Sequence, residues 1–229
     1  KAGKDKALGF LVGQAMKETK GRARAGSLDL TQIQSFKIIE ELLHISVPVL
    51  ADPVFLLDAE AWRKLSAGEL PERPYIMMFF LDRPSPIALK QAALLQEKTG
   101  CDIVYFSYHY DGCTGEFRSG GPKQFLYRID HAQVVLTDSF HACAFSSILS
   151  TPFYAFSRSG FSGAKQMSRV KNLLNTLTMP ERYIDSEKDC CSEIKPIPQE
   201  PVQKKLGNMR SRIHSYLEDV LRQQLGKDM

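Results

Sequence analysis

The segment Val134-Val-Leu-Thr-Asp-Ser-Phe-His-Ala-Cys-Ala-Phe-Ser-Ser-Ile-Leu-Ser-Thr-Pro-Phe-Tyr-Ala-Phe-Ser-Arg158 contains two short apolar runs with a longer run of small and apolar residues between them. The runs 134–136 and 153–156 predict buried strands, because short apolar runs bounded by turn residues are typical of strands. The residues 140–150 predict a helix that starts after the polar corner Thr137-Asp-Ser139. Strand, helix and strand in this order predict a βαβ unit.

His141 lies in the first turn of the predicted helix. In open parallel sheets, ligands bind beyond the carboxyl ends of the strands, where a helix N-terminus presents unpaired N–H groups and the positive end of its dipole. An imidazole at this position projects toward an anionic ligand, so we take His141 as the leading site candidate; the alternative is a purely structural histidine. Asp138, Ser139 and His141 also suggest a hydrolase triad, but the sequence has no Gly-x-Ser-x-Gly elbow.

Segments typical of strands and of helices alternate on both sides of this unit. The predicted strands are Tyr75–Leu81, Asp102–Ser107 and the short pair Tyr183–Ile184, and the predicted helices are one that begins after an N-cap at Asp58, then Pro86–Lys98, Pro122–Asp130, Gln166–Leu177 and the amphipathic Val202–Leu225. Gly100 fits the position just after a helix, and residues 111–121 predict a glycine-rich loop. The alternation predicts an α/β fold, a parallel sheet with helices on both faces.

Composition limits the classes of protein to which the chain can belong. With 229 residues, 43% of them hydrophobic, it can bury one substantial core. Its five cysteines are an odd number without CxxC spacing, which predicts reduced thiols and neither a disulfide framework nor a metal site. We predict no cofactor. No apolar run approaches the roughly 18 residues of a spanning helix, and no signal peptide is evident, so we predict a cytoplasmic protein without a membrane span.

The basic character of the chain is concentrated in residues 1–26. Seven Lys and Arg residues against two acidic ones give this segment a charge of +5, while the whole chain carries +4. Residues 28–43 also have a helical period, and 47–50 predict a strand. We therefore predict two parts, a basic helical segment at 1–26 and an α/β domain at 27–229.

Residues 1–23 resemble the C-terminal tail of the aspartyl/glutamyl-tRNA amidotransferase B-type subunit. The resemblance rests on Ala7-Leu-Gly-Phe-Leu-Val-Gly-Gln14, Met16-Lys17 and Thr19-Lys-Gly21. It implies a weak contact with tRNA through residues 1–26, so one functional alternative is a non-catalytic tRNA-binding fragment. The other interpretation is a solvated basic helix left by a gene fusion, because attraction to phosphates is independent of sequence.

From about residue 30 to the C-terminus the chain resembles the C-terminal half of the polysaccharide pyruvyl transferase family. Four stretches in the order and spacing of that family carry the resemblance: Ala51-Asp-Pro-Val-Phe-Leu-Leu-Asp58 with Trp62; Gly121-Pro122 through Phe125-Leu126; Val135-Leu-Thr-Asp-Ser-Phe-His141 with Ala144-Phe-Ser146 and Pro152-Phe153; and Ser168-Arg169 with Leu173-Leu174. The resemblance implies one Rossmann-like lobe of a GT-B-like fold. Ala142 stands where the family usually has Gly, and the N-terminal lobe of the family is missing.

The resemblance also implies an activity, the transfer of a pyruvyl group from phosphoenolpyruvate to two sugar hydroxyls as a ketal, in cell-surface polysaccharide biosynthesis. It implies phosphoenolpyruvate and a glycan acceptor as partners, His141 as the catalytic residue, and a substrate-binding set of Ser139, Phe140, Arg158 and Arg169. Ser139 as a mere N-cap and Arg169 as a surface charge are the structural alternatives. A third interpretation of the whole chain is a truncated or fused gene product that is inactive as an isolated half.

Overall fold

The computed structural model of the chain describes residues 50–106, 115–158 and 163–225. The chain divides into two compact units, Lys1–Val49 and Leu50–Met229, and every described residue belongs to the second unit. The elements predicted before residue 50 therefore lie outside the described residues, as do His44, His109 and Cys113. The predicted boundary between residues 26 and 27 stays a prediction.

Six strands form one sheet in which every neighbouring pair is parallel. The strands are β1 (Tyr75–Phe79), β2 (Asp102–Phe106), β3 (Glu116–Arg118), β4 (Val134–Thr137), β5 (Phe153–Phe156) and β6 (Tyr183–Ile184). Their order in the sheet is β3-β2-β1-β4-β5-β6. The predicted fold class, a parallel α/β sheet, is confirmed.

This strand order places a reversal of direction between β1 and β4. The chain leaves β1 toward β2 and β3, and then returns to add β4, β5 and β6 on the other side of β1. The same order is found in doubly wound sheets, which bind their ligands at the carboxyl ends of the two strands that flank the reversal. In this chain those ends are Phe79 and Thr137, which lie opposite each other in the register.

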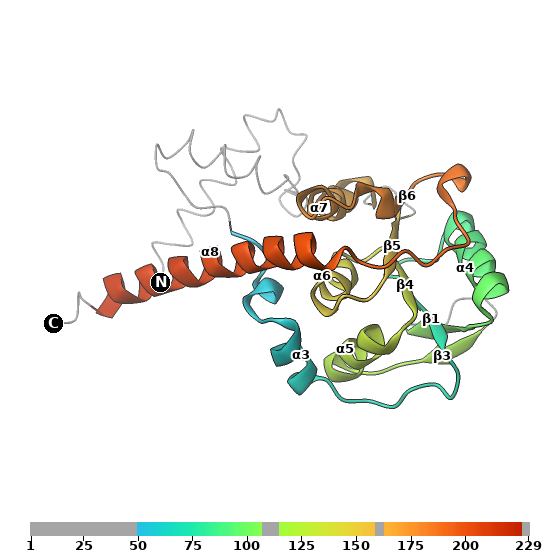
Figure 1. Cartoon of the computed structure of the whole chain (residues 1–229), viewed down its shortest axis with the longest axis horizontal. Coiled ribbons are helices and arrows are strands. Elements are labelled where there is room, and N and C mark those ends of the chain that lie inside the picture. Colours follow the sequence, from blue (N-terminus) through green and yellow to red (C-terminus); the bar gives the residue numbers. More distant parts are fainter. Residues whose placement is uncertain (1–49, 107–114, 159–162, 226–229) are drawn as a thin grey trace, which may run out of the picture. The chain divides into compact units, whose positions relative to one another are not determined.

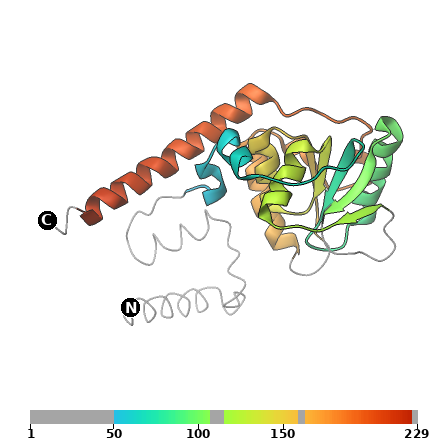
Figure 2. The same cartoon turned by 90° about the horizontal axis from the view of Figure 1, so that it is seen from below.

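Helices connect the strands and cover the sheet on both faces, as predicted. The α-helices are α3 (Ala59–Leu65), α4 (Pro86–Thr99), α5 (Pro122–His131), α6 (Phe140–Leu149), α7 (Gly163–Thr176) and α8 (Gln199–Leu225), and the short 3-10 helices are η1 (Pro53–Leu56), η2 (Pro180–Arg182) and η3 (Glu187–Asp189). Helix α4 lies on one face, whereas α5 and α6 lie on the other (Figures 1 and 2). None of the described helices is long and apolar enough to cross a membrane.

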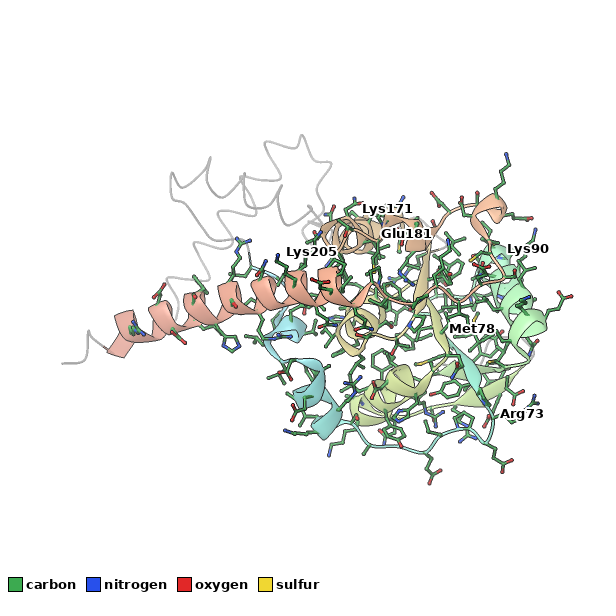
Figure 3. The ribbon with its side chains drawn as sticks, viewed as in Figure 1. Arg73, Met78, Lys90, Lys171, Glu181 and Lys205 are labelled. Atoms are coloured by element: carbon green, nitrogen blue, oxygen red, sulfur yellow. The ribbon has the colours of Figure 1, made fainter. Side chains whose placement is uncertain are left out.

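Two hydrophobic clusters, one on each face of the sheet, form the core. Because side chains alternate along a strand, Met77 packs with α5, α6 and α7, while Ile76 and Met78 pack with α4. Figure 3 shows Met78 inside the unit and Lys90 of α4 at its edge. Burial on both faces explains why the strands appear in the sequence as continuous apolar runs.

Helix α6 follows its predicted bounds because its sequence supplies both ends. The Ser139 side chain accepts a hydrogen bond from the backbone N–H of Ala142 and caps the N-terminus. Ser150 ends the helix in the left-handed conformation, with φ 64°. Gly100 ends α4 in the same way, with φ 69°, as its position after that helix predicted.

Three predicted details were wrong. The glycine-rich loop contains strand β3, which is only three residues long and forms because β2 offers a free edge for pairing. Strand β1 ends at Phe79 and not at Leu81, since the N–H of Leu81 is bonded to a side chain outside the sheet. Helix α8 buries only part of its apolar face: Leu206 is 1% exposed and Leu217 is 40% exposed, and its C-terminal half continues past η1 (Figure 1).

Candidate functional site

A buried carboxylate joins the strand ends at the point where the sheet reverses direction. Asp138 follows β4 directly, and its side chain is 1% exposed. Its two oxygens accept hydrogen bonds from the backbone N–H groups of Leu81 at 2.7 Å and Asp82 at 3.2 Å. Arg158, beyond β5, donates from Nε to Asp138 Oδ2 at 3.0 Å. Asp138 therefore fixes the loop after β1 and the segment after β5 to the end of β4.

Residues next to Asp138 are also held by hydrogen bonds within the protein. The Thr137 hydroxyl donates to the Phe79 carbonyl at 2.6 Å and accepts from the Ser139 N–H at 3.0 Å. Ser139 is 2% exposed, and its hydroxyl oxygen lies 3.4 Å from the N–H of Ala142 that it caps. The turn that leads into α6 is thus rigid, which fixes the direction of the first helical turn.

His141 projects from that first turn toward a carboxylate of a distant segment. Its Nε2 lies 3.8 Å from Asp52 Oδ2, and its side chain is 53% exposed. The same Asp52 oxygen accepts a hydrogen bond from Arg169 Nη2 of α7 at 3.0 Å. We call these three side chains, together with Phe140, the His141 cluster. It lies at the N-terminus of α6, beyond the carboxyl end of β4, where the sequence predicted a site.

Phe140 supports the arginine of the His141 cluster. The Arg169 guanidinium carbon lies 4.2 Å from the centre of the Phe140 ring, a cation–π contact that is worth more as water is excluded. The Phe140 and His141 rings meet edge to face, with centroids 5.6 Å apart. Two groups able to carry positive charge therefore converge at a helix N-terminus, which is a favourable arrangement for an anion.

Asp52 was missed as a site residue by the sequence analysis, although it lies in a stretch that carries the family resemblance. Its Oδ1 accepts from the N–H of Val54 at 3.2 Å and caps η1, where Pro53 occupies the first turn. The Trp62 indole N–H donates to the Val54 carbonyl at 3.0 Å and holds η1 in place. The signal in the sequence was Asp52-Pro53 at the start of that stretch, since such a pair marks a capped turn.

The structure brings together only part of the predicted substrate-binding set. Phe140 and Arg169 lie in the His141 cluster, whereas the Ser139 hydroxyl is used in capping α6. Arg158 is 16% exposed and forms an ion pair with the buried Asp138. The predicted roles of these residues in binding stay predictions.

Cysteine and metal chemistry find no support among the described residues. Burial raises the pKa of the Cys143 thiol in α6 and also that of Cys190, so neither is a favoured nucleophile. No group of three His, Cys, Asp or Glu side chains in the described ranges could hold a metal ion.

Comparison with family models assigns the chain. The model of the polysaccharide pyruvyl transferases matches residues 33–160, which is more than half of the chain. The chain belongs to the polysaccharide pyruvyl transferase family. Asp52, His141 and Arg158 lie inside the segment matched by the pyruvyl transferase model, and Arg169 lies beyond its end. Residues 1–32 match the GatB domain, so both resemblances seen in the sequence are confirmed.

Solved structures and curated sequences were also compared with this pyruvyl transferase family member. A structure described as the glycotransferase of kitacinnamycin is 12% identical, with a TM-score of 0.42, over 77% of this chain and 48% of that one. The glycosyltransferase SnogD from Streptomyces nogalater is 9% identical, with a TM-score of 0.33, over 73% of this chain and 43% of that one. The chain thus spans less than half the length of these two proteins. None of the curated proteins matches it significantly.

Proposed function

We propose that this chain carries the donor-binding half of a polysaccharide pyruvyl transferase, which moves a pyruvyl group from phosphoenolpyruvate to two hydroxyls of a glycan. The observation that supports this most directly is the convergence of His141 and Arg169 at the N-terminus of α6. Family membership restricts the chemistry, and the cluster offers what that chemistry needs. Phosphoenolpyruvate carries a carboxylate and a phosphate, and both are ligands of guanidinium groups and helix N-termini.

The proposed reaction assigns His141 the part of the acid. Its imidazolium donates a proton to the methylene carbon of phosphoenolpyruvate, and the neighbouring carbon becomes electrophilic. One sugar hydroxyl attacks that carbon, the C–O bond to phosphate breaks, and the second hydroxyl closes the ketal. Of the two hydroxyl protons, one replaces the proton that His141 gave to the new methyl group. The other leaves with inorganic phosphate.

Arg169 and the helix N-terminus serve the anionic groups of the donor. The guanidinium is planar and presents several N–H donors, which suits a carboxylate or phosphate better than a lysine would. Phe140 beneath it limits the orientations that the guanidinium adopts. The acceptor hydroxyls are expected to approach from the solvent side of His141, which is half exposed.

Calorimetric titration with phosphoenolpyruvate tests the donor site. The intact chain is compared with His141→Ala and with His131→Ala, a control that removes an exposed histidine from the last turn of α5. We expect saturable binding by the intact chain and by His131→Ala, and binding at least about tenfold weaker in His141→Ala, the factor for losing a hydrogen bond to a charged group. All three proteins are expected to melt within a few degrees of one another.

Two results would contradict the proposal. Absence of binding by the intact chain would mean that this half has no donor site of its own. Equal binding by the intact chain and by His141→Ala would place the donor elsewhere. If His141→Ala lost its far-UV circular dichroism spectrum together with binding, the histidine would be structural.

A second candidate function rests on the match of residues 1–32 to the GatB domain. We propose that the basic segment 1–26 contacts tRNA weakly, through its charge of +5. Filter retention of labelled tRNA at increasing salt tests this contact, with a version of the protein that lacks residues 1–26 as the comparison. Retention that falls with salt and disappears on deletion is expected. Equal retention by the shortened protein would remove this candidate.

A further inference from the structure

Arg169 and His141 converge on one atom of the protein itself. Asp52 Oδ2 lies 3.0 Å from Arg169 Nη2 and 3.8 Å from His141 Nε2. The groups to which the proposed function assigns the anionic donor are therefore already directed at a carboxylate of the chain. Asp52 and Arg169 are the charged groups that the structure places at His141 from η1 and α7, and Asp138 lies three residues before it.

The two oxygens of Asp52 have different tasks. Oδ1 accepts from the N–H of Val54 and caps η1, whereas Oδ2 takes part only in the contacts with Arg169 and His141 among the interactions of the described residues. Loss of the Oδ2 contacts therefore leaves the cap intact. Because the Asp52 side chain is 15% exposed and that of Arg169 is 37% exposed, the contact is accessible to a ligand from the solvent.

A carboxylate at this position lowers the affinity of the cluster for any other anion. Its negative charge offsets that of Arg169, and a ligand carboxylate or phosphate would lie next to like charge unless the Asp52 contact opened. Opening the contact gives up one charge-assisted hydrogen bond, and the bond of the ligand to Arg169 replaces it. The net attraction of the site for the donor is reduced by that exchange.

We propose that Asp52 is an internal competitor for the anionic donor: its Oδ2 holds Arg169 and His141 before the donor binds, and an anionic group of the donor displaces it. The inference rests on the proposed function, since it assigns the donor to the same two side chains. It has a consequence for turnover. After the reaction, the carboxylate returns to Arg169 and displaces the product anion, so that tight ground-state binding does not retard release.

The substitution Asp52→Asn separates the two tasks of Asp52. Asparagine caps helices as well as aspartate does, so η1 keeps its cap while the negative charge at Oδ2 is lost. Asp58→Asn is the matched control, because Asp58 caps α3 through Ala61 at 2.8 Å and is exposed. Calorimetry with phosphoenolpyruvate, and separately with inorganic phosphate, measures the affinity of all three proteins.

We expect Asp52→Asn to bind both anions about tenfold more tightly than the unsubstituted chain, the factor for one charge-assisted hydrogen bond no longer given up. Asp58→Asn should bind as the unsubstituted chain does. Unchanged affinity in Asp52→Asn would overturn the proposal. Weaker binding would overturn it as well, because Asp52 would then be a residue that positions Arg169 for the donor and does not compete with it.

A second measurement does not depend on the donor. Phenylglyoxal modifies arginines, and peptide mass mapping gives the rate at Arg169 relative to Arg73, whose pairing with Asp102 is unaffected by the substitution. Arg169 should react several-fold faster in Asp52→Asn than in the unsubstituted chain. Equal rates would mean that Asp52 does not hold Arg169, and would overturn the inference.

The two measurements distinguish the failure of the inference from failure of the proposed function. If neither protein binds phosphoenolpyruvate or phosphate, the proposed donor site fails, and Asp52 has nothing for which to compete in this chain. If the unsubstituted chain binds phosphoenolpyruvate but Asp52→Asn shows neither tighter binding nor a faster reaction of Arg169, the function stands and the competitor is rejected.

Discussion

Two aspartate–arginine pairs lie close to the same helix N-terminus, and they differ in burial and in the number of their other contacts. In the first pair, Asp138 is 1% and Arg158 is 16% exposed, and Asp138 also binds two backbone N–H groups. In the second pair, Asp52 is 15% and Arg169 is 37% exposed. The N–O distances are equal, at 3.0 Å. Distance therefore does not distinguish them.

The difference shows how one kind of ion pair serves structure in one place and ligand binding in another. The Asp138 carboxylate is surrounded by partners from three segments of the chain, so removal of any of them leaves a buried charge or N–H group unpaired. The Asp52 carboxylate has one oxygen on a cap and one in an accessible contact, so water or a ligand can replace its partner. Accessibility of the contact, and not the presence of a pair, indicates the candidate site.

The largest expected effect is that of Asp138→Ala. The substitution leaves the N–H groups of Leu81 and Asp82 unpaired and a mostly buried Arg158 without its carboxylate, so we expect the free energy of unfolding to fall by about 3–5 kcal/mol. Urea denaturation followed by circular dichroism measures it. Asp102→Ala removes an exposed carboxylate paired with Arg73 and should cost less than about 1 kcal/mol. Similar losses for the two variants would show that burial does not separate the pairs.

A smaller effect is expected when the arginines are exchanged for methionine, which keeps much of the side-chain length. Arg158→Met should lower the free energy of unfolding by about 2–3 kcal/mol, because Asp138 stays buried and keeps only its backbone partners. Arg169→Met should lower it by less than about 1 kcal/mol, since Asp52 remains partly hydrated. The same denaturation measurement applies. If Arg169→Met cost as much as Arg158→Met, the second pair would be structural too.

Much of the fold was predictable because local signals agree with it. The strand 153–156 and the limits of α6 follow from short apolar runs, a serine cap and Thr151-Pro152, and α4 ends where Gly100 predicts. The order of the strands was not predictable in the same way, because apolar runs buried on both faces look alike wherever they lie in a parallel sheet. Strand β3 was missed since three residues beside glycines carry almost no periodicity.

The site was predicted in part, for a related reason. His141 at the N-terminus of α6 follows from one continuous segment of sequence. Asp52 meets Arg169 across 117 positions of the chain, and no local pattern records such a contact. Asp138 has the opposite difficulty: its place next to Ser139 and His141 suggests chemistry, while its function in the fold depends on Leu81 and Arg158, which are far away in sequence.

The smallest expected effect concerns Ser139 and decides between its two interpretations. Its hydroxyl caps α6 through a long contact of 3.4 Å, so Ser139→Ala should lower the free energy of unfolding by only about 0.5–1 kcal/mol, the lower part of the range for N-caps. Ser139→Asn should restore the stability, because asparagine caps equally well. If Ser139 is only a cap, both variants bind phosphoenolpyruvate as the unsubstituted chain does. A loss of donor affinity in Ser139→Asn, despite restored stability, would instead assign the hydroxyl to the donor and extend the accessible site from Arg169 toward the buried Asp138.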